Sequence, residues 1–385
     1  MSNSVDPGQK YSVQPGTRIK YFIIGGDEEE KRFEISKAEV ISSTVKRIKH
    51  EHSLKDIITD LKNVSPILVT GSSGYLGSAI VQTLKEHAIK TVGIDLVDAA
   101  TTDFIGCVSD INVIRKAANQ GCRSVIHTAA LHAPNLDFYS DQDYEKVNVE
   151  GTRNILLVAK ELQMKAVVFS STTSLMITNE VKQREKQANA DVVILQNDVD
   201  YGTPRNIYGI TKKAAEKLCI EDKLVNIAIL RCSRFFVEDV YDTGADPSSR
   251  KIKKTNGNTK ANEMLCGTRA SLEDMVLSHL VAVDRLKNKT SLTGNVVIGP
   301  LIISSVSPLL NNSDCSIAVD SGVSIAAKSQ LYKGFGWSLP DRISRIYDST
   351  NSWKTLGFTP KWDFHRLIKE YNTEENAANI QYGRY

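Results

Sequence analysis

The sequence has no run of about 18 apolar residues, the length that a membrane-spanning helix needs. Its first thirty residues also lack a basic segment followed by an apolar one, which is the pattern of a secretory signal. The six cysteines are scattered and form no C-x-x-C pair, so neither a disulfide framework nor a zinc site is indicated. We therefore expect a cytoplasmic protein that holds no metal ion.

An excess of charge of either sign is also missing. The 48 lysines and arginines are nearly balanced by 45 aspartates and glutamates, which leaves a formal charge of +3. This balance gives no reason to expect nucleic acid or a membrane surface as a partner. With 41% hydrophobic and 24% charged residues over 385 positions, the composition is that of a folded protein of two to three domains, or of one large enzyme with additions.

Short apolar runs rich in valine and isoleucine alternate with longer amphipathic segments from about residue 65 onwards. The runs predict strands at Ile67–Thr70, Thr91–Ile94, Ser124–His127, Ala166–Phe169 and Asn226–Leu230. The amphipathic segments predict helices at Leu76–His87, Ile111–Asn119, Asp143–Leu162, Asn206–Glu221 and Ser271–Leu286. Apolar strands joined by helical crossovers are typical of a parallel sheet covered on both faces. The predicted fold class is α/β, with a doubly wound parallel sheet.

Two further segments stand apart from this alternation. Residues 1–63 contain an expected strand, Ile19–Ile24, and apolar residues at helical spacing between Lys37 and Leu61, which predicts a small α/β appendage. The polar segment Asp242–Asn262 carries five basic residues and two acidic residues. We expect a solvated loop there, and the alternative is a mobile flap that meets an anionic group of a substrate.

The expected strand Ile67–Thr70 runs directly into the turn G-S-S-G-Y-L-G at residues 71–77 and then into a helix. Gly71 permits the tight turn, Gly74 lets a pyrophosphate approach the backbone, and Gly77 lets the helix pack closely on the sheet. Backbone N–H groups and the positive end of the helix dipole then face the anion. The cofactor-binding residues predicted in this turn are Gly71, Ser73, Gly74, Tyr75, Leu76 and Gly77.

Asp95 ends the next expected strand, 18 residues after Gly77. A carboxylate at about this distance accepts hydrogen bonds from the ribose hydroxyls of a dinucleotide and repels a 2′-phosphate. The sequence therefore favours NAD over NADP as cofactor.

Tyr208 and Lys212 lie one helical turn apart on the same face of the expected helix Asn206–Glu221. This helix comes after the expected strand Ala166–Phe169 and the loop that follows it, and it borders the carboxyl ends of the strands, where cofactors bind in open α/β sheets. A neighbouring ammonium and an oxidised nicotinamide both favour the phenolate of Tyr208, which can then exchange a proton with a substrate hydroxyl or carbonyl. The hydroxyl-rich residues 170–174 offer a second group to orient that oxygen.

Taken together, these residues resemble the extended short-chain dehydrogenase/reductase superfamily, in its branch of NAD-dependent epimerases and dehydratases that act on nucleotide sugars. The resemblance covers about residues 65–365. It rests on Thr70-Gly71-x-x-Gly74-x-x-Gly77, Asp95, Ser109-Asp110-Ile111, His127-Thr128-Ala129-Ala130, Val147–Thr152, Phe169–Thr172 and Tyr208-x-x-x-Lys212. It implies a Rossmann domain over residues 64–233 with a return at 271–300, and a smaller substrate-binding lobe from residues 234–270 and 301–385.

The resemblance also assigns roles to single residues. It implies that Tyr208 is the catalytic acid/base, that Lys212 binds the nicotinamide ribose and lowers the tyrosine pKa, and that Thr172 orients the substrate. The implied substrate contacts are Thr172, Thr173 and Arg234. The resemblance further implies cofactor contacts at Asp110, Ile111, Ala129, Ala130, His132 and Asn148. Of these, Asp110 and Ile111 would meet the adenine, and Ala129 and Ala130 would line the pyrophosphate and ribose channel.

Departures from the family pattern restrict the expected reaction. Thr172 is followed by Thr173 and Ser174, where the sugar 4,6-dehydratases of this branch carry an Asp-Glu pair and the related decarboxylases carry a glutamate. Glu180 lies further along, in what we expect to be a solvated polar loop. Dehydration and decarboxylation are therefore not expected.

Two other departures concern epimerases. His132 stands where many 4-epimerases have a lysine, and Arg234 stands where they have an asparagine that contacts the substrate. Arg234 is either a different anion clamp or a structural ion pair. Arg269, the candidate for clamping a nucleotide diphosphate, precedes Glu273 by a segment shorter than in the family.

We expect an NAD-dependent oxidoreductase or epimerase that acts on a secondary alcohol or ketone of a sugar or nucleotide sugar, and that forms a homodimer. The alternative is a catalytically silent NAD-binding sensor or scaffold protein. The presence of Tyr208, Lys212 and Thr172 favours the enzyme, because a protein that only binds NAD has no need of them.

Overall fold

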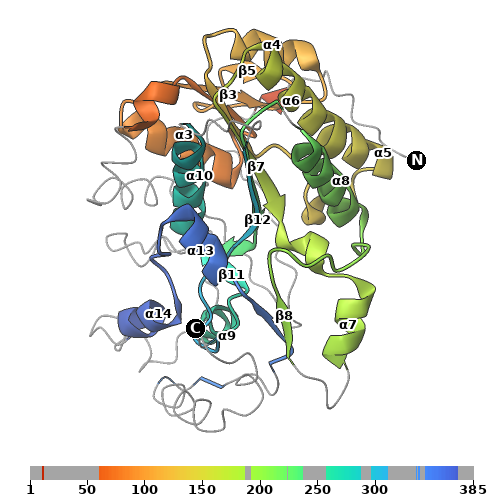
Figure 1. Cartoon of the computed structure of the whole chain (residues 1–385), viewed down its shortest axis with the longest axis vertical. Coiled ribbons are helices and arrows are strands. Elements are labelled where there is room, and N and C mark those ends of the chain that lie inside the picture. The colour runs from red at the N-terminus through yellow and green to blue at the C-terminus, as the bar shows by residue number, and fades with distance from the viewer. Residues whose placement is uncertain are drawn as a thin grey trace.

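Figure 1 shows a computed structural model of the chain, which describes residues 11–12, 60–186, 192–222, 224–236, 257–287, 296–310, 335, 337–338 and 343–371. Its centre is a seven-stranded sheet of order β12-β9-β7-β6-β2-β3-β5, in which every neighbouring pair is parallel. In chain order these strands are β2 (Ile67–Thr70), β3 (Thr91–Asp95), β5 (Phe104–Ile105), β6 (Ser124–His127), β7 (Ala166–Thr172), β9 (Ile227–Cys232) and β12 (Val297–Ile303). The predicted fold class is confirmed.

Helices cover both faces of this sheet (Figure 1). Helices α3 (Tyr75–Glu86) and α10 (Leu272–Lys287) lie on one face. Helices α4 (Ile111–Ala118), α6 (Gly151–Glu161) and α8 (Ile207–Glu221) lie on the other. Successive side chains of a strand point to opposite faces, so Ile67 and Val69 enter the first core and Leu68 enters the second. Both sets must be apolar, which explains the uninterrupted apolar runs of the sequence.

The edges of the elements differ from the predictions in several places. The helix expected at Asp143–Leu162 begins earlier, as α5 (Asp141–Tyr144), because the Ser140 hydroxyl accepts a hydrogen bond from the Asp143 N–H and caps it. It then continues through a π-helical segment, η3 (Glu145–Glu150), before α6. Hydrophobic spacing does not reveal such a widened turn, because the extra residue shifts the register only locally.

Strands β5 and β12 were missed by the sequence analysis. Strand β5 has two residues and is too short for a periodic pattern. Strand β12 contains Gly299 and Pro300, which are both depleted in strands, and its register against β9 shifts between Ile298 and Leu301.

Further short elements lie beyond the carboxyl edge of the central sheet (Figure 1). Strand β10 (Arg234–Phe236) pairs with β11 (Arg269–Ser271), and β8 (Val193–Leu195) pairs with β13 (Arg345–Tyr347). The helices of this region are α7 (Asn179–Lys186), α9 (Gly257–Leu265) and α14 (Phe364–Tyr371). Helix α13 (Thr350–Leu356), in contrast, packs through Trp353 and Leu356 into the core that α3 and α10 form with the sheet. Trp362 and Phe364 are buried with Met264 in a separate core.

Two predicted loops are partly helical, and one predicted region is mostly undescribed. Residues 257–262 of the expected loop belong to α9, and Glu180 lies on α7 rather than in a loop, although it is exposed as expected. Of residues 1–63, the structure describes β1 (Tyr11–Ser12), which pairs with β4 (Val97–Asp98), and residues 60–63. The strand expected at Ile19–Ile24 lies outside the described residues, and so does nearly all of the helical pattern that follows it.

A buried network holds α8 against the carboxyl ends of the strands. The Arg231 guanidinium on β9 contacts the Glu216 carboxylate on α8 through Nη2–Oε2 at 2.8 Å and Nε–Oε1 at 3.0 Å. The Ser171 hydroxyl on β7 donates to the same carboxylate at 2.5 Å. Glu216 lies one helical turn beyond Lys212 and two beyond Tyr208, on the same helix face. The network therefore determines where these two side chains stand relative to β7 and β9.

Replacing Glu216 should destabilise the fold strongly. In Glu216→Gln the Arg231 charge stays buried without its partner, which costs about 3–5 kcal/mol of unfolding free energy. The matched control is Glu161→Gln, which breaks the exposed Arg115–Glu161 pair and should change stability little. Urea unfolding followed by circular dichroism measures both variants. Equal losses in the two would show that the buried pair does not hold α8 in place.

Candidate active site

The turn between β2 and α3 is shaped by its glycines. Gly71 has φ +67°, in the left-handed region that glycine adopts without strain. A Cβ at Gly77 would lie 2.0 Å from the Gly71 carbonyl oxygen, so only glycine lets α3 approach the turn this closely. Gly74 is the N-cap residue of α3, and no side chain caps the helix. The positive end of α3 is therefore open to an anion, which fits the pyrophosphate of a dinucleotide.

Asp95 stands beside this turn at the end of β3. Its Oδ2 accepts a hydrogen bond from the Ser73 N–H at 2.9 Å, and its Oδ1 accepts one from the Val97 N–H at 3.1 Å. A carboxylate has about four acceptor positions, so two remain for donors such as ribose hydroxyls. The residues of the turn and Asp95 thus fit a dinucleotide that carries a free 2′-hydroxyl.

The other predicted cofactor residues lie along the same edge of the sheet. The backbone of Ala129, which is followed by Ala130, packs closely against the turn. A Cβ placed on Gly71 would lie only 2.8 Å from the Ala129 nitrogen. Asp110 caps α4, which begins at Ile111, by accepting a hydrogen bond from the Asn112 N–H at 2.9 Å. This capping role was not foreseen from the sequence.

Asn148 lies on η3 and is buried, and its amide is engaged with the protein. Its Oδ1 accepts from the Leu131 N–H at 2.8 Å, and its Nδ2 donates to the Leu131 carbonyl at 3.1 Å and to the Thr211 hydroxyl at 3.1 Å. Asn148 therefore joins the segment after β6 to α8. By these contacts it positions other residues of the candidate site.

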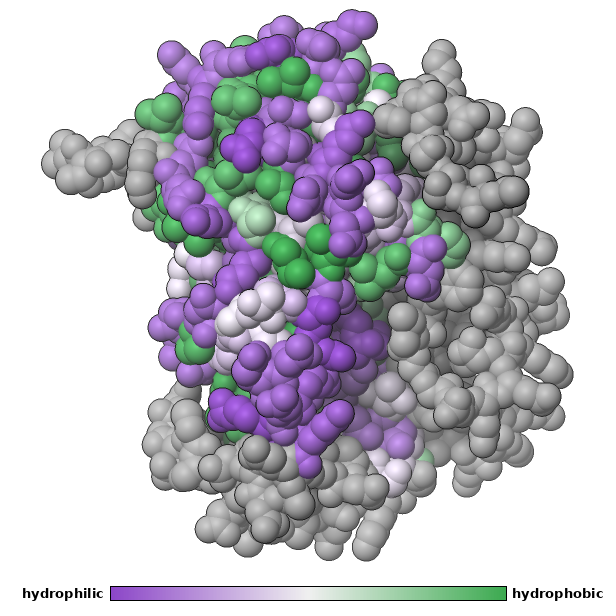
Figure 2. Space-filling model, turned by 90° about the vertical axis from the view of Figure 1, so that its right-hand side faces the viewer, coloured by the Kyte–Doolittle hydropathy of each residue, from purple (hydrophilic) through white to green (hydrophobic). Residues whose placement is uncertain are grey.

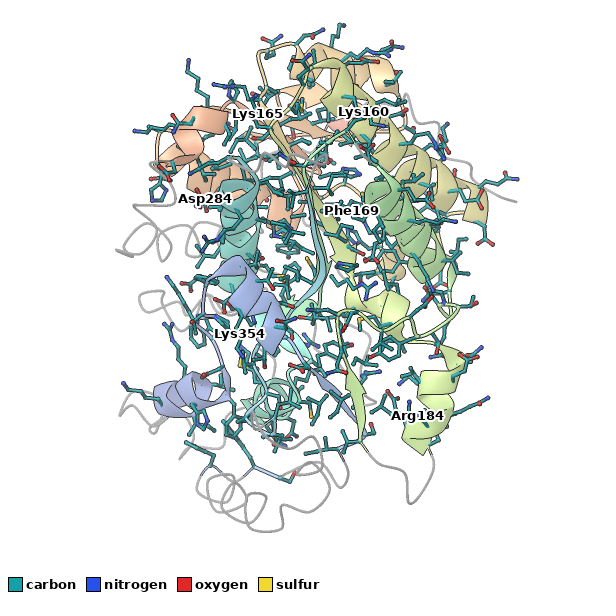
Figure 3. All side chains as sticks on the ribbon, viewed as in Figure 1. Lys160, Lys165, Phe169, Arg184, Asp284 and Lys354 are labelled. Carbon is teal, nitrogen blue, oxygen red and sulfur yellow. The ribbon has the colours of Figure 1, made fainter. Side chains whose placement is uncertain are left out.

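The three predicted catalytic residues come together at the carboxyl ends of β7 and β9. Tyr208 and Lys212 of α8 are 6% and 2% exposed, and Thr172 ends β7. The Lys212 Nζ lies 4.1 Å from the ring centroid of Phe169, which is labelled in Figure 3. The Thr172 side chain lies near enough to Tyr208 to lower the pKa of its hydroxyl. Thr173 follows Thr172 and is also buried.

Burial determines the charge states in this cluster. It raises the pKa of Tyr208 above its usual range, and the Thr172 side chain opposes this only in part. Burial also lowers the pKa of Lys212 to about 8. The predicted lowering of the tyrosine pKa is therefore not found in this structure, because the desolvation of a buried phenolate outweighs the opposing effect of Thr172. Tyr208 is a neutral phenol at neutral pH.

Arg234 and Arg269 lie side by side across the β10–β11 pair and share one partner. Arg234 Nη2 lies 3.3 Å from Glu263 Oε1, and Arg269 forms an ion pair with the same carboxylate. The Arg269 side chain is 12% exposed, whereas that of Arg234 is 62% exposed. Arg234 thus forms the structural ion pair that was one of the two expectations, and most of its guanidinium still faces solvent.

Cys232 is a residue of the site that the sequence analysis missed. It ends β9 directly opposite Thr172 in the sheet register. Burial raises the pKa of its thiol to about 12, although the Lys212 charge acts in the opposite direction. The signal for Cys232 was its position just after the apolar run Asn226–Leu230, at the same sheet edge as Thr172.

Within the part of the chain that the structure describes, no three His, Cys, Asp or Glu side chains are grouped so that they could hold a metal ion. The described helices include none with the length and apolar character needed to cross a membrane.

Comparison with known proteins places this geometry in a family. Residues 67–276, more than half of the chain, match the model of the NAD dependent epimerase/dehydratase family. The 3β-hydroxysteroid dehydrogenase/Δ5→4-isomerase of vaccinia virus (strain Ankara) is 27% identical over 198 residues, which cover 48% of this chain and 54% of that protein. The UDP-glucose 4-epimerase of Halalkalibacterium halodurans is 29% identical over 195 residues, covering 48% and 53%. The chain spans about half the length of these curated relatives.

Solved structures share the fold at low sequence identity. A short-chain dehydrogenase/reductase superfamily protein of Agrobacterium tumefaciens with bound NAD is 21% identical, with a TM-score of 0.50, over 83% of this chain and 99% of that one. A UDP-glucose 4-epimerase of Thermotoga maritima is 18% identical, with a TM-score of 0.50, over 82% and 99%. With its glycine-rich turn and parallel sheet, the chain belongs to the NAD-dependent epimerase/dehydratase family, and its cofactor is NAD.

Proposed function

We propose that the protein is an NAD-dependent oxidoreductase or epimerase that transfers a hydride at a secondary alcohol carbon of a sugar or nucleotide sugar. The observation that carries this proposal is the buried cluster of Tyr208, Lys212 and Thr172 at the carboxyl edge of the sheet. A buried phenol, ammonium and hydroxyl gathered at one edge of the sheet are costly to keep unless they act on a ligand.

Each of these side chains has a task that its position allows. NAD supplies the hydride acceptor when bound, in the turn of residues 71–77 and beside Asp95. Thr172 donates a hydrogen bond to the substrate oxygen and orients it. Tyr208, which lies beside Thr172, exchanges a proton with the same oxygen. Lys212 binds the nicotinamide ribose and keeps a positive charge near the phenol.

The surroundings of Thr172 favour simple hydride transfer over elimination. Thr173 is buried and Ser174 is half-buried, and neither can act as the carboxylate that removes a proton next to a ketone. Glu180 is exposed on α7. We therefore propose oxidation, reduction or epimerisation, with no dehydrated or decarboxylated product.

The substrate class rests on the smaller lobe. We propose that residues 234–270 and 301–385 form it and bind the substrate, with Thr173 and Arg234 among the contacts. Arg234 is the exposed member of the two arginines that share Glu263. A phosphate or carboxylate group of a sugar derivative complements this exposed guanidinium. The named relatives act on a steroid and on a nucleotide sugar, and the exposed arginine favours the anionic one.

We also propose that two copies pair through the face that carries η3 and α8. Figure 2 shows this side of the molecule, where hydrophobic side chains gather among hydrophilic ones. A groove between η3 and α8 is lined by Val149, Ile210, Ala214, Lys146 and Glu150. Ile210 is 42% exposed, and Leu157 on the adjacent α6 is 40% exposed. Glu145 also lines this groove, so apolar residues stand beside charges of both signs, which suits a two-fold contact with an identical surface.

The first prediction from this proposal concerns cofactor choice. The protein should bind NADH more tightly than NADPH, and Asp95→Ala should weaken NADH binding by about tenfold, the value of a lost charge-assisted hydrogen bond. Fluorescence titration with both cofactors measures this. Asp98→Ala is the matched control, because Asp98 lies three residues further along and is exposed. Unchanged preference in Asp95→Ala would contradict the assignment.

A second prediction tests the reaction itself. A panel of nucleotide sugars and free sugars is incubated with NAD, and the products are identified by mass spectrometry and NMR. Tyr208→Phe should keep NAD binding and lower turnover by about 10²–10⁴-fold, as expected when a general acid/base is removed. Tyr201→Phe is the matched control, since its hydroxyl bonds only to backbone atoms near β8 in the described contacts. A dehydrated 4-keto-6-deoxy product, or full activity of Tyr208→Phe, would refute the proposal.

Oligomeric state provides a further check. Analytical ultracentrifugation should show a dimer, and Ile210→Glu should shift it to the monomer because it places a charge in the apolar contact. Leu224→Glu, which is more exposed at 70% but lies beyond the end of α8, should leave the dimer intact. A monomeric wild-type protein would exclude the pairing.

A further inference from the structure

His132 lies against the candidate acid/base from a distant part of the chain. Its Nδ1 lies 3.5 Å from the Tyr208 hydroxyl oxygen, and the two ring centroids are 5.8 Å apart. Tyr208 is buried, whereas His132 has an exposed surface. The imidazole is therefore placed between the buried phenol and solvent. Hydrogen bonds of catalytic groups are often long before the substrate binds, so this separation suits proton transfer.

The position of His132 is fixed by its neighbours on three elements. The Tyr144 hydroxyl of α5 donates to the His132 carbonyl at 2.7 Å, and the His132 N–H donates to Asn135 Oδ1 at 2.9 Å. Asn148 of η3 holds the preceding residue, Leu131, through two hydrogen bonds. Tyr144 and Asn148 are both buried. The segment is thus anchored at two consecutive residues, which keeps the ring over Tyr208.

The charge states in the cluster require a second group that can accept the proton of Tyr208. Burial raises the pKa of Tyr208, so the phenol is protonated and must release its own proton when it accepts one from a substrate. The titratable groups described around His132 are Tyr208 and Lys212 of α8 and Tyr144 of α5. Desolvation of the imidazole by the surrounding protein lowers the pKa of His132, and the Lys212 charge lowers it further. The imidazole is therefore neutral and able to accept a proton.

We propose that His132 takes the proton of Tyr208 and passes it to solvent, and that the enzyme is therefore a net dehydrogenase or reductase rather than an epimerase. This inference rests on the proposed function of Tyr208. In the oxidation direction the substrate C–H bond breaks and its hydride reduces NAD⁺ to NADH. The alcohol proton moves to the Tyr208 oxygen, the Tyr208 proton moves to His132 Nδ1, and the proton on His132 Nε2 leaves to water, while the C=O bond forms.

The number of protons released to solvent differs between the two reaction types. One proton leaves to solvent for each NAD⁺ reduced, so a net oxidation needs an exit from the buried phenol. An epimerase returns both the hydride and the proton to the same sugar carbon and oxygen, so it needs no exit. A basic side chain that joins the phenol to solvent thus favours net oxidation or reduction over epimerisation.

The first test uses the protein with NAD⁺ and no substrate. Nitrogen NMR of ¹⁵N-histidine-labelled protein identifies the His132 signals by their loss in His132→Gln. In wild type Nδ1 should have the shift of a hydrogen-bonded acceptor and Nε2 that of a protonated nitrogen. Tyr208→Phe should move the Nδ1 signal by several ppm and leave His365 of α14 unchanged. An unmoved Nδ1 signal would overturn the inference.

The second test uses the sugar on which the wild type reduces NAD⁺ in the panel. His132→Gln should lower kcat by about 10²-fold, with little change in KM or NAD affinity, because glutamine cannot relay a proton. Added imidazole should restore part of the activity of His132→Ala, an effect that a purely structural role would not give. His365→Gln, exposed on α14, is the control that should keep full activity. Full activity of His132→Gln, or a loss that imidazole does not rescue, would overturn the relay.

The outcomes also separate this inference from the proposed function. Loss of activity in Tyr208→Phe together with full activity in His132→Gln would remove the relay and leave the role of Tyr208 standing. Full activity in both variants would refute the proposed function as well. Release of an epimerised sugar with no accumulated NADH would contradict net oxidation.

Discussion

The buried ion pair between Arg231 and Glu216 is the interaction on which the candidate site depends most. It joins β9 to α8 and, through the Ser171 hydroxyl, to β7. The pair lies in the interior, so its net contribution to stability is small, but separating the two side chains would leave a buried charge without a partner. This constraint also positions Tyr208 and Lys212, because they lie on the same face of the helix as Glu216. A shift of α8 along the sheet would leave a buried charge unpaired.

Desolvation is the second physical factor that organises the site. The same burial raises the pKa of Tyr208 and of the Cys232 thiol and lowers the pKa of Lys212. Each group is thereby pushed toward its neutral form. A neutral phenol can donate as well as accept a proton, provided that a second group completes the exchange. The neighbouring His132, with one side in solvent, is in the right place for that task.

The cofactor end of the site depends on backbone geometry rather than on side-chain charge. Gly71 and Gly77 allow α3 to begin directly above the end of β2, and Asp95 is oriented by the N–H groups of Ser73 and Val97. The proposed substrate contact Arg234, in contrast, lies on one of the short elements outside the sheet, where Arg234 and Arg269 share Glu263. One end of the proposed site is thus built from the regular sheet, and the other from short segments.

The sequence by itself determined the features that depend on local spacing. These are the apolar strands, the amphipathic helices, the glycine-rich turn with Asp95, and the Tyr208–Lys212 pair one helical turn apart. Only the tertiary structure decided which distant residues meet, such as His132 with Tyr208, 76 positions apart, and Cys232 with Thr172 across two strands. It also reversed the predicted direction of the Tyr208 pKa shift. Residue spacing carries no information on how completely a side chain is withdrawn from water, and that desolvation sets the charge state.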